Sequence, residues 1–166
     1  AFRRLQNKTQ VFPLPGSVFV HNRLTHSLEV SCVGRSIGNN VGRELSAKYP
    51  ELSAELSEIG AIVATACLAH DLGNPPFGHS GENAIGTFFS EGKGVEYRNR
   101  LNITEEQWAD LTTFEGNANA FRILTHQFEG RRKGGFVLTY PTLASIVKYP
   151  YESRFADKKK QKFGFF

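Results

Sequence analysis

The sequence predicts a mostly α fold for this chain. In its longest regular stretches, apolar residues recur at steps of three to five, which is the spacing of one helix face. Only two short runs, residues 18–20 and 136–139, have the composition of strands. The 166 residues, 40% hydrophobic and 22% charged, are enough to bury one core and are too apolar for a disordered chain. We therefore expect one mostly helical domain.

The longest predicted helix covers residues 24–46. Its apolar stripe has six members: Leu24, Leu28, Val33, Ile37, Val41 and Leu45. Pro50 follows, and a second helix is predicted over residues 51–71, with glutamates in its early turns, where the helix dipole favours them. A Gly-Asn-Pro-Pro run at residues 73–76 ends this helix.

Four shorter helices are predicted further along the chain. They cover residues 81–89, a segment from Thr104 through Trp108, residues 115–127 and residues 141–148. Thr104 and Gln107 have the spacing of a capping box, which marks the start of the second of these. The apolar stripes of helices 24–46 and 115–127 are wider than the predicted neighbours can cover. We therefore expect a larger helical body to cover them, and exposed apolar surface on this chain alone.

Composition also excludes several classes of protein. The longest apolar run, residues 61–69, is far shorter than the ~20 residues of a membrane span, and residues 1–10 are polar, unlike a signal peptide. Cys32 and Cys67 have no CxxC spacing and are expected to be small buried apolar residues. We therefore expect a cytoplasmic protein with no membrane partner. Since the chain has no Met and opens at Ala1, we also expect it to be a piece of a longer protein.

Charge is distributed unevenly along the chain, whose net charge is +4. Residues 51–90 contain five acidic residues and no Lys or Arg, while dense basic runs occupy residues 131–133 and 158–162. An acidic segment that contains histidines suits a cation site, and basic flanks suit a polyanionic substrate. The alternative for the two basic runs is that they are solvated loops.

Two histidines and one aspartate form a candidate metal site. His70 and Asp71 are adjacent at the predicted end of the second helix, and His26 lies 44 residues upstream in the first. Neutral imidazole and carboxylate are ligands for Mn²⁺, Fe²⁺ or Zn²⁺, and less readily for Mg²⁺. Adjacent residues on a straight helix diverge by about 100°, so His70 and Asp71 can face one ion only where the helix ends. From composition alone, hydrogen-bonded core histidines are an equal alternative.

Five strings of the sequence carry a family resemblance. They are RRLQNKTQVFPL (residues 3–14), NRLTHSLEV (22–30), AHDLGNPPFGHSGE (69–82), FEGNA (114–118) and SIVKYP (145–150). In this order they resemble the HD-domain phosphohydrolases, and within them the deoxyguanosine triphosphate triphosphohydrolase branch. The resemblance implies that residues 1–166 are the N-terminal part of an HD-domain helical bundle.

The resemblance also implies roles for individual residues. His26, His70 and Asp71 match metal ligands of that family, and His79 and Glu82 match its catalytic pair. Substrate contacts are implied for a further set, in which Gln10 meets the sugar 3′-hydroxyl, Arg23 the triphosphate and the others phosphate or base: Gln10, Arg23, Asn74, Lys148 and Tyr149. The family's fourth ligand is a later aspartate that neither Asp110 nor Asp157 matches in context, so we expect it beyond residue 166.

The activity that the resemblance implies is hydrolysis of deoxynucleoside triphosphates, dGTP foremost, to deoxynucleoside and inorganic triphosphate. It implies a divalent metal cofactor, which would be Mn²⁺, Mg²⁺ or Fe²⁺, with Zn²⁺ or Ni²⁺ as substitutes taken up in a crystal. We also expect a homo-oligomer and a nucleotide or single-stranded nucleic acid as effector. Two alternatives stay open, namely another HD enzyme such as a 5′-nucleotidase or phosphodiesterase, and a non-catalytic module that binds nucleotides or nucleic acid.

Overall fold

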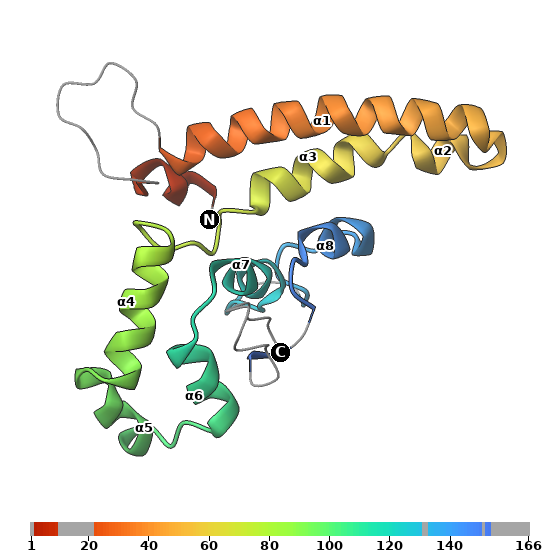
Figure 1. Cartoon of the computed structure of the whole chain (residues 1–166). Helices are drawn as coiled ribbons and strands as arrows, with labels where there is room; N and C mark the ends of the chain where they lie inside the picture. Colours follow the sequence, from red (N-terminus) through yellow and green to blue (C-terminus); the bar gives the residue numbers. More distant parts are fainter. Residues whose placement is uncertain (1, 10–21, 131–132, 151, 154–166) are drawn as a thin grey trace, which may run out of the picture.

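The computed structural model describes residues 2–9, 22–130, 133–150 and 152–153 (Figure 1). These residues form α-helices and 3₁₀ helices (η) and no strand, which confirms the mostly α fold. In chain order the elements are η1 (Phe2–Asn7), α1 (Arg23–Lys48), η2 (Pro50–Leu52), α2 (Ser53–Leu56), α3 (Ile59–Ala69), α4 (His79–Ser90), η3 (Lys93–Val95), α5 (Glu96–Arg100), α6 (Glu105–Thr112), α7 (Gly116–Thr125) and α8 (Tyr140–Ile146).

A helical hairpin dominates the fold. α1 confirms the long predicted helix, and α3 runs back beside it, so that the end of α3 lies next to the start of α1 (Figure 1). The single helix predicted over residues 51–71 is wrong in one respect, because the chain breaks into η2, α2 and α3. The Ser57 hydroxyl donates to the Ala54 carbonyl oxygen at 2.6 Å, a local bond that competes with helix continuation.

Small residues let the two long helices approach closely. Apart from Arg23, the buried residues of α1 are all small: Ser27, Ser31, Gly34, Gly38 and Gly42. A Cβ added at Gly38 would lie 2.9 Å from the Gly60 Cα, and one at Gly42 would lie 2.6 Å from the Leu56 carbonyl oxygen. Only glycine leaves the backbones this close. We call this contact of Gly34, Gly38 and Gly42 the seam, and it fixes the register of α1 against α3.

The predicted apolar stripe of α1 is not its packed face. Four of its members are exposed at 45–59%: Leu28, Val33, Ile37 and Val41. Cys32 is exposed as well and Cys67 is half-buried, so the expectation that both are buried is wrong. The physical reason is the seam, since a backbone contact made by serine and glycine turns the larger side chains of α1 away from α3.

The apolar core lies at the end of the hairpin where α1 begins and α3 ends, and where η1, α3, α7 and α8 meet. Its buried members are Leu5, Ala66, Ala69, Leu72, Ala120, Leu124 and Ile146. Burial of this kind is worth about 25 cal/mol per Å² of apolar surface. Because α3 enters the cluster just before it ends, the core holds the residues after Ala69 in place.

The second half of the chain agrees with the prediction in most elements. α4, α6, α7 and α8 confirm the four shorter helices, and both bonds of the Thr104–Gln107 capping box are present. The prediction missed η1, η3 and α5. Residues 136–139 are a turn followed by irregular chain, which contradicts the strand-like assignment, and residues 18–20 lie outside the described residues.

One stretch has the composition of a membrane span, which the sequence reading did not anticipate. Residues Pro50–Ala69 reach a mean hydropathy of 1.5 and are the one such stretch within the described ranges. The core helix of a soluble protein can have the same length and hydropathy. Here the stretch carries Glu51, Glu55 and Glu58 and is divided among η2, α2 and α3.

Candidate metal centre

The hairpin brings His26 and His70 together from positions 44 residues apart. The Asn22 side chain caps α1, where its Oδ1 accepts from the Thr25 backbone N–H at 3.0 Å. This cap starts the helix at Arg23 and puts His26 in the first turns. His70 and Asp71 follow directly after the end of α3, which the hairpin places beside that first turn (Figure 1).

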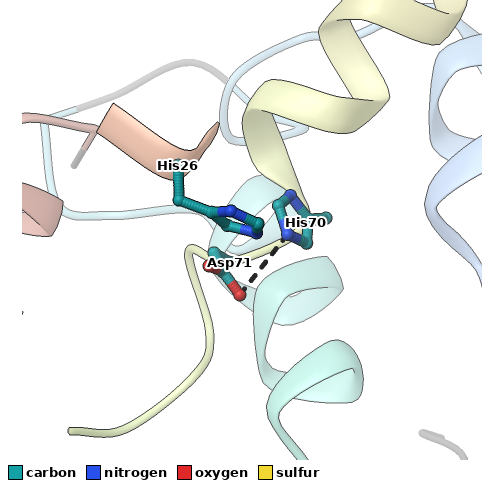
Figure 2. Close-up of side chains that lie close together, drawn as sticks. All are labelled: His26, His70 and Asp71. Atoms are coloured by element: carbon teal, nitrogen blue, oxygen red, sulfur yellow. Dashed lines mark ion pairs between the residues drawn. The ribbon is translucent and has the colours of Figure 1, made fainter. Parts of the chain in front are cut away.

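His26, His70 and Asp71 form a cluster of three ligand atoms within 4.8 Å of one another. Their side chains converge from the start of α1 and the end of α3 (Figure 2). The two imidazole rings have centroids 5.4 Å apart at an interplanar angle of 64°. The Nε2 atom of His70 is 3.5 Å from the Oδ1 atom of Asp71. Sequence reasoning expected these residues together, and the structure brings them together.

A backbone hydrogen bond orients the His70 ring. Its Nδ1 lies 2.6 Å from the Cys67 carbonyl oxygen, and a carbonyl can only accept, so Nδ1 carries the proton. The Nε2 lone pair is then free to bind a cation. A bond from the second ring nitrogen to a carbonyl is the usual way in which proteins fix a metal-ligating histidine.

Asp71 is buried, with an exposed fraction of 3%. Its Oδ1 pairs with the Arg23 guanidinium at 2.8 Å and accepts from the Asn74 side-chain amide at 2.5 Å. Its Oδ2 is buried and has no hydrogen-bond partner among the described residues. The cluster thus combines two imidazoles with a buried carboxylate that has one unpartnered oxygen. This donor set fits a divalent metal ion, because the ion would supply the charge that a buried carboxylate needs.

The loop after Asp71 is held from two sides. The Lys8 Nζ atom donates to the carbonyl oxygens of Leu72 and Asn74, at 3.3 and 3.0 Å. Burial, together with the charge of Arg23, lowers the pKa of Lys8, and Asp71 opposes this. On the other side a Cβ on Gly73 would lie 2.1 Å from the Ala120 backbone nitrogen, so only glycine lets the loop pack on α7.

A tight turn directs the chain from this loop into α4. Phe77 and Gly78 both have positive φ, 66° and 55°. Such a φ is uncommon for a bulky residue, and it stores local strain that the surrounding contacts must hold. The turn ends at Gly78, so α4 begins at His79.

His79 and Glu82 form a second pair in the first turn of α4. The His79 Nδ1 and the Glu82 Oε2 are 2.6 Å apart, and the Glu82 Oε1 accepts from the Gly116 backbone N–H at 2.9 Å. Glu82 therefore ties α4 to the start of α7. The His79 side chain is 93% exposed, whereas that of Glu82 is 11% exposed. A held imidazole that faces solvent can move a proton to or from a bound molecule.

The structure places some of the other residues expected at the site beside the cluster and others away from it. Asn74 joins the centre through Asp71, and Arg23 joins it through the same carboxylate. Lys148 lies just after α8, with its Nζ 5.3 Å from the centre of the Tyr149 ring. Gln10 lies outside the described residues, so its role stays a prediction.

Sequence reasoning missed Gly116 as a site residue. A Cβ there would lie 1.8 Å from the Asn74 Oδ1 and 2.8 Å from the Glu82 Oε1, so this glycine makes room for both side chains. Glu115 caps α7, where its side chain accepts from the Ala118 N–H at 2.8 Å. A glycine directly after this capping residue was the sequence signal that could have pointed to Gly116.

Comparison with known families agrees with this geometry. A family profile described as HD domain matches residues 23–148, more than half of the chain. The chain belongs to the HD-domain family. The match begins at Arg23 and includes the three clustered ligands and the His79–Glu82 pair.

Curated relatives give a narrower likeness. The chain is 50% identical over 171 residues to a protein from Pseudomonas aeruginosa and 49% identical over 174 residues to one from Synechocystis, both called deoxyguanosinetriphosphate triphosphohydrolase-like. A protein from Yersinia enterocolitica called deoxyguanosinetriphosphate triphosphohydrolase is 40% identical over 175 residues. These alignments cover 99, 100 and 90% of this chain, but only 37, 40 and 34% of the relatives. The chain thus spans little more than a third of their length.

Proposed function

We propose that this chain carries the metal site and the catalytic pair of a hydrolase that converts deoxynucleoside triphosphates, dGTP foremost, to deoxynucleoside and inorganic triphosphate. The observation that carries the proposal is the cluster of His26, His70 and Asp71 with its open carboxylate oxygen. The names of the relatives supply the substrate class.

His26, His70 and Asp71 would hold the metal. A divalent cation bound there supplies Lewis-acid activation of water and neutralises charge on a phosphoryl group. Mn²⁺ and Fe²⁺ are the first candidates, since two imidazoles and one carboxylate favour a transition metal. Mg²⁺ is a third candidate that this donor set favours less, because Mg²⁺ prefers oxygen ligands. Zn²⁺ or Ni²⁺ would occupy the same ligands as substitutes.

The His79–Glu82 pair moves the proton in this proposal. Glu82 holds Nδ1, so the Nε2 atom of the exposed ring is the one that meets the substrate. Hydrolysis at the α-phosphorus breaks the bond to the 5′-oxygen, and that oxygen needs a proton to leave. A protonated His79 can donate it, or a neutral His79 can accept a proton from the attacking water.

Substrate contacts are proposed for the remaining residues that the sequence singled out. Asn74 borders the metal loop, and Lys148 and Tyr149 offer a cation and a ring after α8. Gln10 would discriminate the sugar through its 3′-hydroxyl. Phosphate oxygens are good acceptors for the ammonium group of Lys148.

We also propose that a fourth protein ligand lies outside residues 1–166. Asp110 accepts from the Ser153 hydroxyl at 2.6 Å, burial raises its pKa, and it is not part of the cluster. Asp157 lies outside the described residues. Because a lost ligand directly lowers metal affinity, the 166-residue chain alone should bind Mn²⁺ weakly and release no measurable triphosphate, while a longer version that includes the family's later aspartate should be active.

The proposal includes a homo-oligomer, a nucleotide or single-stranded nucleic acid as effector, and a cytoplasmic location. The exposed apolar residues of α1 offer a surface for association between copies of the protein: Leu28, Val33, Ile37 and Val41. Of the basic runs that suggested nucleic acid, only Lys133 falls within the described residues.

The deciding experiment is product analysis with dGTP and Mn²⁺ in the intact protein that contains this chain. Inorganic triphosphate with deoxyguanosine is the expected product pair, and Asp71→Ala should abolish it. Release of orthophosphate or pyrophosphate would instead indicate another HD phosphohydrolase, such as a nucleotidase or phosphodiesterase. Binding of dGTP or single-stranded DNA without any turnover, and without a metal requirement, would indicate a binding module.

A further inference from the structure

Arg23 is buried more deeply than a substrate contact needs to be. It is the first residue of α1, behind the Asn22 cap, and its exposed fraction is 4%. Burial of a guanidinium is costly unless the charge is paired and hydrogen-bonded. The contacts that offset this cost therefore define what the side chain does.

The ion pair and the hydrogen bond that the Arg23 side chain makes with described residues lie on the loop that follows α3. One terminal nitrogen of Arg23 is 2.8 Å from the Asp71 Oδ1, and the other donates to the Pro75 carbonyl oxygen at 3.4 Å. The Nε atom has no hydrogen-bond partner within the described part of the chain. The fork of the guanidinium thus spans the loop from its ligand end to its proline end.

This arrangement fixes the orientation of the Asp71 carboxylate. Arg23 and Asn74 together saturate Oδ1, since a carboxylate oxygen has two lone-pair directions. Oδ2 is left buried and open. Rotation of the carboxylate would break both bonds, so the open oxygen stays on the side that the two contacts leave free.

We propose that Arg23 is a positioning residue for the metal centre, which acts through Asp71 and sets the affinity for the metal ion. This is a different role from the triphosphate contact that the sequence suggested. The inference rests on the proposed function only in that Asp71 is taken as a metal ligand. A contact with phosphate would require the guanidinium to leave or share the Asp71 carboxylate and to become accessible.

Arg23→Lys is the decisive variant, because it keeps the charge and removes the fork. A lysine offers a single ammonium group, which cannot span Asp71 and Pro75 as two separate nitrogens do. Arg23→Gln is less clean, because it also removes the repulsion between the guanidinium and an incoming cation. Arg43→Lys is the matched control, since Arg43 is exposed near the other end of the same helix and contacts Asn40.

The primary measurement is Mn²⁺ affinity in the intact protein without nucleotide, from the electron paramagnetic resonance signal of free Mn²⁺. Arg23→Lys should weaken the affinity about 10-fold, the lower end of what loss of an outer-shell contact to a metal ligand costs. Arg43→Lys should bind as the unmodified protein does. Excess Mn²⁺ should restore kcat in Arg23→Lys, with KM for dGTP unchanged.

The opposite pattern would overturn the inference. Unchanged Mn²⁺ affinity together with a raised KM for dGTP would assign Arg23 to the substrate. Should Arg23→Lys fail to fold, as judged by circular dichroism, Arg23→Gln takes its place. Because this variant also removes the repulsion between the guanidinium and the cation, weaker Mn²⁺ affinity in it supports action through Asp71. Unchanged or tighter Mn²⁺ affinity contradicts it. A protein that binds Mn²⁺ as described but releases no triphosphate would refute the proposed function and leave this inference standing.

Discussion

Two histidine–carboxylate pairs lie on either side of one turn, and they are built in opposite ways. In the His70–Asp71 pair the carboxylate is buried, is held by Arg23 and Asn74, and keeps one oxygen open. In the His79–Glu82 pair the carboxylate uses one oxygen for the imidazole and the other for the Gly116 N–H, and the ring faces solvent.

The difference shows how environment divides roles between the same residue types. A buried carboxylate with an open oxygen suits a cation, which supplies the charge that the oxygen lacks. A carboxylate with both oxygens occupied suits the orientation of an imidazole, whose second nitrogen is then presented to a ligand. We therefore expect the first pair to govern metal binding and the second to govern proton transfer.

The largest effect is expected from Asp71→Ala. The variant removes a ligand and leaves the Arg23 guanidinium buried without its partner, which costs about 3–5 kcal/mol in comparable buried pairs. In the intact protein that contains this chain, metal content by elemental analysis should fall from near one per polypeptide to background, and triphosphate release should vanish. Asp110→Ala, on an aspartate outside the cluster, should keep its metal. Full metal content in Asp71→Ala would show that the His70–Asp71 pair does not govern metal binding.

His79→Ala should have the next largest effect, and only on turnover. Loss of a general acid or base lowers kcat by about 10²–10⁴-fold. Since His79 is outside the cluster of ligands, Mn²⁺ affinity and stoichiometry should not change. Metal titration measures the affinity and the stoichiometry, and steady-state kinetics measure kcat. If His79→Ala strips the metal, His79 is a ligand and the division of roles is wrong.

Glu82→Gln should have a smaller effect in the same direction. Its amide oxygen can still accept from the Gly116 N–H, but its amide nitrogen cannot accept the proton on the His79 Nδ1. A hydrogen bond to a charged group is worth about 1.5–3 kcal/mol, so kcat should fall roughly 10- to 100-fold. The pH dependence of kcat should shift along with its magnitude. An unchanged pH profile with a lowered melting temperature would point to a purely structural role for Glu82.

The sequence predicted the first helix of the hairpin well, the second as one unbroken helix that the structure divides, and their contact poorly. Helical spacing in residues 24–46 is strong enough to predict α1 without tertiary information. The contact face follows a different rule, because Gly38 and Gly42 allow close backbone approach and Gly34 leaves room for the Cys67 side chain. Apolar periodicity gives no weight to glycine, so it indicated the exposed stripe with Ile37 and Val41 but not the face that packs on α3.

The residues of the site could be named from sequence, but their connections could not. The family strings contain His26, His70, Asp71, His79 and Glu82. The pairing of Arg23 with Asp71 joins residues 48 positions apart, and it arises only when α3 returns beside the start of α1. The bond from the Gly116 N–H to Glu82 depends on the backbone and not on a side chain, so residue type gives no direct indication of it.

The smallest effect is expected from Gly116→Ala, which touches both pairs without removing a group from either. The new Cβ would lie 1.8 Å from the Asn74 Oδ1 and 2.8 Å from the Glu82 Oε1, so both side chains must shift. Overpacking of this kind costs about 1–3 kcal/mol. Both Mn²⁺ affinity and kcat should therefore fall, each by less than in the variants above. Gly38→Ala is the matched control, because its Cβ would lie 2.9 Å from the Gly60 Cα in the seam, away from either pair. It should lower the melting temperature to a similar extent while Mn²⁺ affinity stays unchanged at a temperature where both variants are folded. A loss of Mn²⁺ affinity in both variants would mean that the hairpin register, and not the Asn74 contact, controls the metal centre.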